Sequence, residues 1–129
     1  MKAENTILVD TDILIDYLRG IPSAIQYLET SAADLSLSVV NVAELHAGVR
    51  DHEREAVNAL LECFKIVPLD KEIAVRGGLL RRDFGKSHGI ELADALIAAT
   101  VESIGGTLAT LNRKHYPMLS SVMVPYAKE

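Results

Sequence analysis

The chain has little of several residue types that mark particular protein classes. Its one cysteine, Cys63, excludes a disulfide framework and a cysteine-based zinc cluster. It has no tryptophan, and aromatic residues make up only 5% of it, so its core must be aliphatic. No apolar run reaches the ~18–20 residues that a membrane span needs. Residues 1–5 carry a charge of each sign, unlike a signal peptide. We therefore expect a cytoplasmic protein with no membrane association.

A surplus of positive charge is also absent. The 13 Lys and Arg residues are outnumbered by 18 Asp and Glu residues, which leaves a net charge of −5. Proteins that coat nucleic acid through bulk charge are usually basic, so the composition argues against that mode of binding. A length of 129 residues with 49% hydrophobic content suits a single domain, 1–129, with a true core rather than a disordered chain.

The hydrophobic pattern alternates between strands and helices along the chain. Apolar, β-branched runs predict strands, and apolar residues at helical spacing predict the helices between them. This alternation predicts an α/β fold, with a mostly parallel five-stranded sheet and helices on both faces. The expected strands are 6–9, 35–40, 66–69, 107–110 and 122–124, and Pro68 makes the third an edge strand or marks its end. The main expected helices are one that follows Asp12 with apolar residues from Ile13 to Leu18 and ends at Gly20, then 22–29, one opening at Asn41, 53–64, 71–88 and 92–104.

Ligands of such sheets bind just beyond the carboxyl ends of strands, and four polar residues are expected at that edge. Asp10 closes the first strand, Glu44 lies one turn into the helix after the second, and Asp94 lies in the first turn of the Ala-rich helix. Asn112 follows the fourth strand by two residues. Three carboxylates at one edge would repel one another, and Mg²⁺ or Mn²⁺ is the usual remedy. We therefore take all four as candidate catalytic residues and the three acids as candidate metal ligands.

Each of these residues also has a purely structural interpretation. Asn41 and Glu44 have the spacing of a capping box, Asp94 could complement a helix dipole, and Asp10 could cap the first helix. Because all of these residues are expected at one sheet edge, a metal site is favoured over separate structural roles. An acid that caps a helix can also be a metal ligand. Asp12 is close enough to join the site, but whether it points there stays open.

Other charged residues are assigned to the surface or to substrate contacts. Asp16, one helical turn beyond Asp12, is expected on a solvated helix face. The basic residues at 76–88 suit a solvated helix or phosphate contact equally well, whereas those at 113–115 adjoin the candidate site and favour phosphate contact. The two clusters are Arg76, Arg81, Arg82, Lys86 and His88, and Arg113, Lys114 and His115.

Four segments together resemble a known family. Residues 7–16 (ILVDTDILID) look like the opening strand and turn of a PIN domain, and residues 42–48 (VAELHAG) resemble its second acidic motif. Residues 94–100 (DALIAAT) are similar to the third motif and are the most specific of the set, and residues 108–112 (LATLN) resemble the last. The likeness covers essentially the whole chain, and the most similar group is the VapC toxins of VapBC toxin–antitoxin modules.

The resemblance implies a PIN-like three-layer α/β/α sandwich and a Mg²⁺- or Mn²⁺-dependent endoribonuclease, with tRNA or rRNA as candidate substrates. Asp10, Glu44 and Asp94 would be the metal-binding acids. A homodimer and a VapB-type antitoxin whose tail blocks the active groove are also implied. Many family members carry a fourth acid where this chain has Asn112, which leaves open whether one metal or two would bind.

Three other functions are compatible with parts of the sequence. A phosphoacceptor signalling domain would need an acceptor at Asp70 and a lysine at Lys128, both poorly placed. Asp10-Thr11-Asp12 looks like the nucleophile loop of haloacid-dehalogenase phosphatases, although that family needs a longer chain with a cap region. A catalytically weak PIN domain that only binds partners is suggested by Asn112.

Overall fold

The computed structural model describes residues 6–31 and 34–127. None of the helices in these two ranges is long and apolar enough to cross a membrane. Helices and strands alternate almost as the sequence predicts. The elements are β1 (Thr6–Val9), α1 (Thr11–Leu18), α2 (Pro22–Thr30), β2 (Asp34–Ser38), α3 (Val39–Gly48), a 3₁₀ turn (Asp51–Glu53), α4 (Arg54–Leu61), β3 (Lys65–Val67), α5 (Lys71–His88), α6 (Leu92–Ile104), β4 (Thr107–Ala109), a second 3₁₀ turn (Arg113–His115) and β5 (Val122–Met123).

The described strands form one five-stranded sheet in the order β3-β2-β1-β4-β5. Every pairing in it is parallel, which confirms the predicted sheet. β3 lies at one edge, as Pro68 predicts, because proline has no N–H group with which to continue a ladder. β1 lies in the centre, and Val9 is in register with Ala109 of β4.

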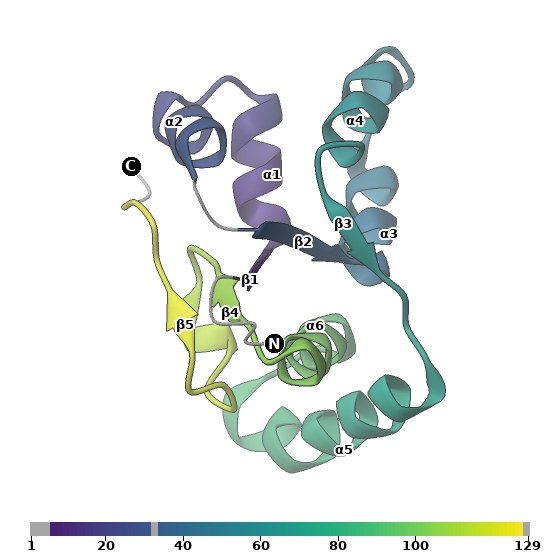
Figure 1. Ribbon diagram of the computed structural model, residues 1–129. Coiled ribbons are helices and arrows are strands. Elements are labelled where there is room, and N and C mark those ends of the chain that lie inside the picture. Colours follow the sequence, from purple (N-terminus) through teal and green to yellow (C-terminus); the bar gives the residue numbers. More distant parts are fainter. Residues whose placement is uncertain (1–5, 32–33, 128–129) are drawn as a thin grey trace.

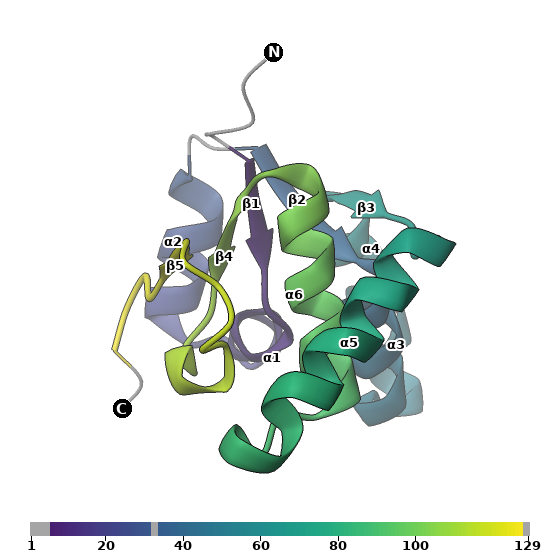
Figure 2. The same ribbon diagram turned by 90° about the horizontal axis from the view of Figure 1, so that it is seen from below.

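Helices cover both faces of the sheet, so the molecule has three layers (Figure 1). α5 and α6 lie on one side, with α6 against the sheet and α5 outside it (Figure 2). Leu8 and Leu108 point to this side and pack with Ile97 and Ala98 of α6. α1 and α2 lie on the other side. The core on that side joins residues of β1, β2 and β4 with residues of α1, α3 and α4, among them Val9, Leu37, Ala109, Ile13, Leu14, Leu45, Val57 and Leu60.

α5 is one continuous helix in spite of the adjacent glycines at its centre. Asp70 caps it by accepting a hydrogen bond from the Ile73 amide, and Gly89 ends it with a φ of 65°. At Gly77 a Cβ would lie 2.5 Å from a methyl carbon of Leu96 and 3.1 Å from its Cα. The missing side chain therefore lets α5 and α6 pack closely, which offsets the weak helix propensity of glycine.

Candidate active site at the carboxyl edge of the sheet

The carboxyl ends of β1 and β4 lie side by side at the centre of the sheet. The chain leaves β1 through α1 and α2 on one face and reaches β4 through α5 and α6 on the other. Connections that part to opposite faces open a crevice between two parallel strands. Asp10 follows β1 directly and Thr110 follows β4, and the Asp10 amide continues the ladder by donating to the Ala109 carbonyl at 2.9 Å.

Asp10 is almost fully buried and is held by three hydrogen bonds. It is the N-cap of α1, where its Oδ1 accepts from the Thr11 amide at 2.9 Å. Its Oδ2 accepts from the Thr110 hydroxyl at 2.8 Å and from the Tyr116 hydroxyl at 3.0 Å. The structural and functional interpretations of Asp10 thus hold together, because the cap fixes the carboxylate at the crevice.

The environment of Asp10 disfavours its charged form. Burial, together with the negative charge of Asp12, raises the pKa of Asp10 from 3.8 to about 7, although the hydrogen bonds to its carboxylate oppose the rise. The pKa of Asp94 is also raised, mainly by burial, and the charge of His115 opposes that rise. Acids that resist ionisation in a crevice are typical of catalytic and metal-binding sites.

Tyr116 joins the two acids and is the residue that the sequence analysis missed. Its hydroxyl lies 3.3 Å from Asp94 Oδ1 as well as 3.0 Å from Asp10 Oδ2. On the far side of Asp94, His115 Nδ1 lies 3.7 Å from Oδ2. The sequence offers only a weak signal, a tyrosine just after Asn112 and the basic turn, since such a residue has an apolar ring and a polar tip but its contacts depend on the fold.

Glu44 is positioned through Thr11. The Thr11 hydroxyl donates to Glu44 Oε1 at 2.7 Å and accepts from Asn41 Nδ2 at 2.9 Å. Asn41 is fully buried, and its Oδ1 accepts from the Ser38 amide at 2.8 Å. A chain of hydrogen bonds thus runs from the end of β2 to the Glu44 carboxylate.

The N-cap predicted for α3 is wrong by three residues. The sequence suggested a strand through Val40 and a capping box of Asn41 with Glu44. In the structure, Ser38 is the N-cap, its hydroxyl accepts from the Val40 amide, and Asn41 closes the capping box. The β-branched Val39 and Val40 resemble a strand in sequence, but the Ser38 cap places them in the first helical turn.

Asp12 faces the site, which answers the question that the sequence left open. Its Oδ2 accepts from the Leu111 amide and from Asn112 Nδ2, both at 3.0 Å. The Asn112 amide is therefore directed toward Asp12. Asp16, expected on a solvated face, is instead only 5% exposed and accepts from the Tyr126 hydroxyl at 2.9 Å. That expectation was wrong because the contact comes from a segment 110 residues further along the chain.

Several basic side chains have structural partners. On α5, Arg76 pairs with Glu102 at 2.8 Å and Arg82 pairs with Asp83 at 3.0 Å. Arg113 donates to the Val122 carbonyl at 3.2 Å. The solvated-helix interpretation thus accounts for these two residues of α5, and Lys114 lies exposed beside the site.

The donor chemistry at this edge suits a hard divalent cation. The candidate ligands are carboxylate oxygens, which Mg²⁺ and Mn²⁺ prefer, and a cation would relieve the cost of ionising the buried Asp10. Within residues 6–31 and 34–127, however, no three His, Cys, Asp or Glu side chains are grouped as ligands for one ion. Asp10 and Asp94 are joined through Tyr116, whereas Glu44 is held by Thr11, so the side chains must adjust for all three acids to share an ion.

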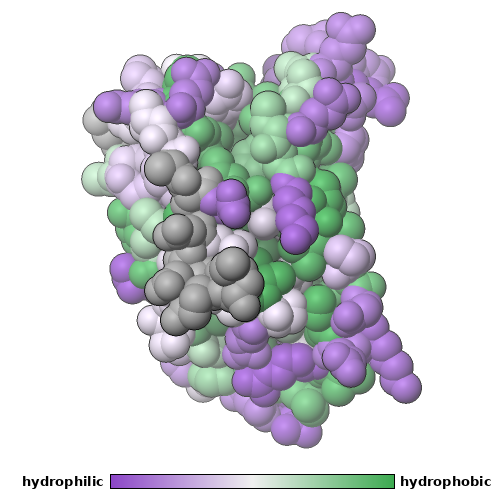
Figure 3. Space-filling model, viewed as in Figure 1, coloured by the Kyte–Doolittle hydropathy of each residue, from purple (hydrophilic) through white to green (hydrophobic). Residues whose placement is uncertain are grey.

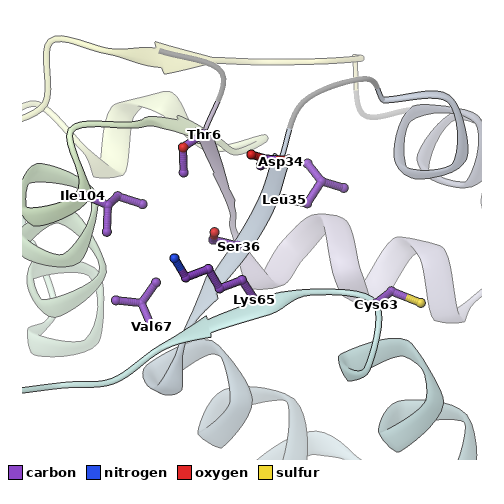
Figure 4. Close-up of a pocket in the computed structure, with 8 residues that line it drawn as sticks. All are labelled: Thr6, Asp34, Leu35, Ser36, Cys63, Lys65, Val67 and Ile104. Atoms are coloured by element: carbon purple, nitrogen blue, oxygen red, sulfur yellow. The ribbon is translucent and has the colours of Figure 1, made fainter. Parts of the chain in front are cut away.

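A cavity of about 730 Å³ lies away from these acids, at the amino ends of the strands. Thr6, Asp34 and Lys65, the first residues of β1, β2 and β3, line it. The Lys65 side chain extends across it beside Ser36 (Figure 4). The same side of the molecule shows hydrophilic side chains over α4 and α5, with hydrophobic surface between them (Figure 3). The volume of this cavity therefore does not identify the candidate active site. The acidic side chains that converge at the opposite ends of the strands identify it.

Comparison with known proteins identifies the family. A model of the PIN domain matches residues 7–118. The chain belongs to the PIN-domain family. Ribonuclease VapC10 of Mycobacterium tuberculosis is 44% identical to it over 124 residues, which cover 94% of this chain and 93% of that protein. Ribonuclease VapC1 of Methanocaldococcus jannaschii is 35% identical over 121 residues, which cover 92% of this chain and 84% of that protein.

Solved structures share the fold over nearly the whole chain. A toxin–antitoxin complex from Klebsiella pneumoniae superimposes with a TM-score of 0.82 at 30% identity, covering 95% of this chain and 99% of that chain. FitAcB from Neisseria gonorrhoeae gives a TM-score of 0.72 at 29% identity, covering 92% and 97%. The predicted PIN-like three-layer architecture is confirmed.

Two of the competing functions do not fit the PIN fold. A phosphoacceptor domain needs its acceptor at the end of a central strand, but Asp70 caps α5 after the edge strand β3. Lys128 lies outside the described residues. The Asp10-Thr11-Asp12 turn that resembled a phosphatase loop lies within the residues that match the PIN domain.

Proposed function

We propose that the protein is a Mg²⁺- or Mn²⁺-dependent endoribonuclease and the toxin of a toxin–antitoxin module. The observation that carries the proposal is the joining of Asp10 and Asp94 through one hydroxyl, at the switch point of a PIN-domain sheet. The names of the relatives, which are VapC ribonucleases, support the activity. Hydrolysis of an RNA phosphodiester bond is the chemistry that carboxylates and a divalent cation can support.

The residues at this edge would have different roles in the reaction. Asp10 and Asp94 would hold the cation, and Glu44 would complete its shell after its side chain turns from Thr11. When bound, the cation would polarise the scissile phosphate and lower the pKa of the attacking water. Asn112 has no ionisable group, so it cannot act as a base, and its amide orients Asp12. This leaves one acid fewer for a second metal.

The substrate chain would run past the turn after β4. Lys114 is exposed there, and His115 Nδ1 lies 3.7 Å from Asp94 Oδ2. Contacts from such side chains to phosphates fix the position of an RNA without reading its sequence. A net charge of −5 predicts weak binding away from this edge, because few cations are available to displace counterions.

A groove beside Glu44 suits a VapB-type antitoxin. It measures about 130 Å³ between α1, α3 and α4. Its lining includes Leu18, Leu45 and Val57 together with two acids, Glu44 and Glu53, and one base, Arg19. Apolar walls with acids at the rim fit an amphipathic segment that carries basic residues. An antitoxin seated there would reach the catalytic edge through Glu44 and block it. The structural similarity to a toxin–antitoxin complex supports this partner.

The homodimer that the resemblance implies stays a prediction. Val75 and Leu79 lie one turn apart on α5 and are 53% and 37% exposed. Apolar side chains on one exposed helix face would suit self-association.

RNA cleavage tests the proposed activity. The purified protein should cleave a mixture of structured RNAs with Mn²⁺ and should stop when EDTA is added. Asp94→Asn should abolish cleavage, since an amide is a far weaker ligand than a carboxylate, whereas the control Asp83→Asn, which alters an exposed acid on α5, should cleave normally. Equal cleavage by both variants would overturn the assignment of Asp94.

A further inference from the structure

The Tyr116 hydroxyl lies between two acids of the site, Asp10 and Asp94, while the ring of Tyr116 is apolar and buried. The ring is 2% exposed and packs in the core beneath α6. We propose that Tyr116 is a positioning residue, which orients the carboxylate of Asp10 beside that of Asp94 for a divalent cation. This proposal rests on the proposed metal-dependent function and adds a residue to it.

The hydrogen bonds select which oxygen of Asp10 can face a cation. A carboxylate oxygen has two lone pairs in its plane. Those of Asp10 Oδ2 are engaged by the hydroxyls of Thr110 and Tyr116, whereas Oδ1 accepts only from the Thr11 amide within residues 6–31 and 34–127. Oδ1 therefore keeps a lone pair for a ligand bond. Without the Tyr116 hydroxyl, the carboxylate could rotate and this preference would be lost.

The Tyr116 hydroxyl also affects Asp94, because it has only one proton to donate. It can donate to only one carboxylate at a time, and Asp10 Oδ2 at 3.0 Å is closer than Asp94 Oδ1 at 3.3 Å. When both acids are ionised, Asp94 Oδ1 therefore faces a lone pair of the tyrosine oxygen, and a cation beside Asp94 would relieve that repulsion. Tyr116 thus orients Asp10 by donation and leaves the charge of Asp94 for the metal.

Tyr126 provides a matched comparison within the chain. Its hydroxyl also donates to a carboxylate, that of Asp16, at 2.9 Å. Removing this hydroxyl costs a tyrosine–aspartate hydrogen bond without touching Asp10 or Asp94. If Tyr116→Phe changes Mn²⁺ binding and Tyr126→Phe does not, the change is caused by the position of Tyr116 in the site. It is then not a general effect of losing a tyrosine–aspartate hydrogen bond.

Calorimetric titration of Mn²⁺ into the protein without RNA tests the proposal. Tyr116→Phe should weaken Mn²⁺ binding about 10-fold, the lower end of the range for partners that orient metal ligands. Tyr126→Phe should bind Mn²⁺ like the wild type. In cleavage assays, Tyr116→Phe should require more Mn²⁺ for half-maximal rate while the KM for RNA stays unchanged.

Replacing Tyr116 with 4-aminophenylalanine, which restores a donor, should recover the affinity. If Tyr116→Phe does not fold, the amino analogue is compared with 4-methylphenylalanine, which has the same shape and no donor. Equal Mn²⁺ affinity with and without a donor at position 116 would overturn the role of Tyr116 and leave the proposed function standing. A wild-type protein that binds no Mn²⁺ would overturn both.

Discussion

Asp10→Asn should make the metal-free protein more stable while it abolishes function. Burial and the charge of Asp12 raise the pKa of Asp10 to about 7, whereas an unfolded chain has the ordinary value of 3.8. Between about pH 4 and pH 7 the folded protein therefore keeps a proton that the unfolded chain has lost. Since the folded state binds more protons, raising the pH through this window destabilises it. A neutral Asn cannot be destabilised in this way.

The expected size of the effect follows from the two pKa values. Each pKa unit corresponds to about 1.4 kcal/mol, so the rise gives up to about 4 kcal/mol at pH 8. An amide fits the three donors around Asp10 less well than a carboxylate does, which costs about 1–2 kcal/mol. We therefore expect Asp10→Asn to stabilise the metal-free protein by about 2–3 kcal/mol at pH 8. For a chain of this length, that raises the melting temperature by roughly 10 °C.

Thermal unfolding in EDTA, measured by circular dichroism at pH 5 and pH 8, checks this prediction. The wild type should lose stability between the two pH values, and Asp10→Asn should lose much less. Mg²⁺ should raise the melting temperature of the wild type alone, because a ligand that binds only the folded state stabilises it. An Asp10→Asn variant no more stable than the wild type at pH 8 would refute the reasoning, and Asp83→Asn controls for the loss of one charge.

Further predictions concern the helix pair and the support of Glu44. Gly77→Ala should destabilise the protein by about 1–3 kcal/mol, because the new Cβ would meet Leu96 at 2.5 Å, whereas Gly78→Ala, with nothing within 4 Å, should stabilise it by about 0.5–1 kcal/mol. Urea unfolding measures the free energy of unfolding of both variants, and equal changes in it would contradict the close packing of α5 and α6. Thr11→Val should slow RNA cleavage about 10-fold, because Glu44 loses the hydroxyl that positions it. Steady-state rates measured at saturating Mn²⁺ check this, and an unchanged rate would show that Glu44 needs no such support.

The sequence predicted the elements whose signals are local. β1 is a continuous apolar run, and its bounds were predicted correctly because buried parallel strands have that pattern. α5 was predicted over its full length from its helical pattern and from Gly89 at its end, although adjacent glycines within a helix lower its propensity. The reason for Gly77, contact with Leu96 of another helix, is tertiary and has no local signal.

The site was predictable only in part. Asp10, Glu44 and Asp94 could be chosen because parallel strands bring their carboxyl ends to one edge. Tyr116 could not, because its bond to Asp10 spans 106 residues and depends on how the turn after β4 folds back. The burial of Asp16 under Tyr126 was missed for the same reason. Motif spacing thus located the acids, while the hydroxyls that orient them appeared only in the structure.

Locating Mn²⁺ by its anomalous X-ray scattering, in crystals of the wild-type protein, tests the central claim most directly. The account predicts a peak at the carboxyl edge of the sheet, bonded to carboxylate oxygens of Asp10 and Asp94. The same measurement on Asp94→Asn should show the peak much weakened or absent. A peak bound elsewhere, or none at this edge in crystals of protein that cleaves RNA with Mn²⁺, would contradict the account.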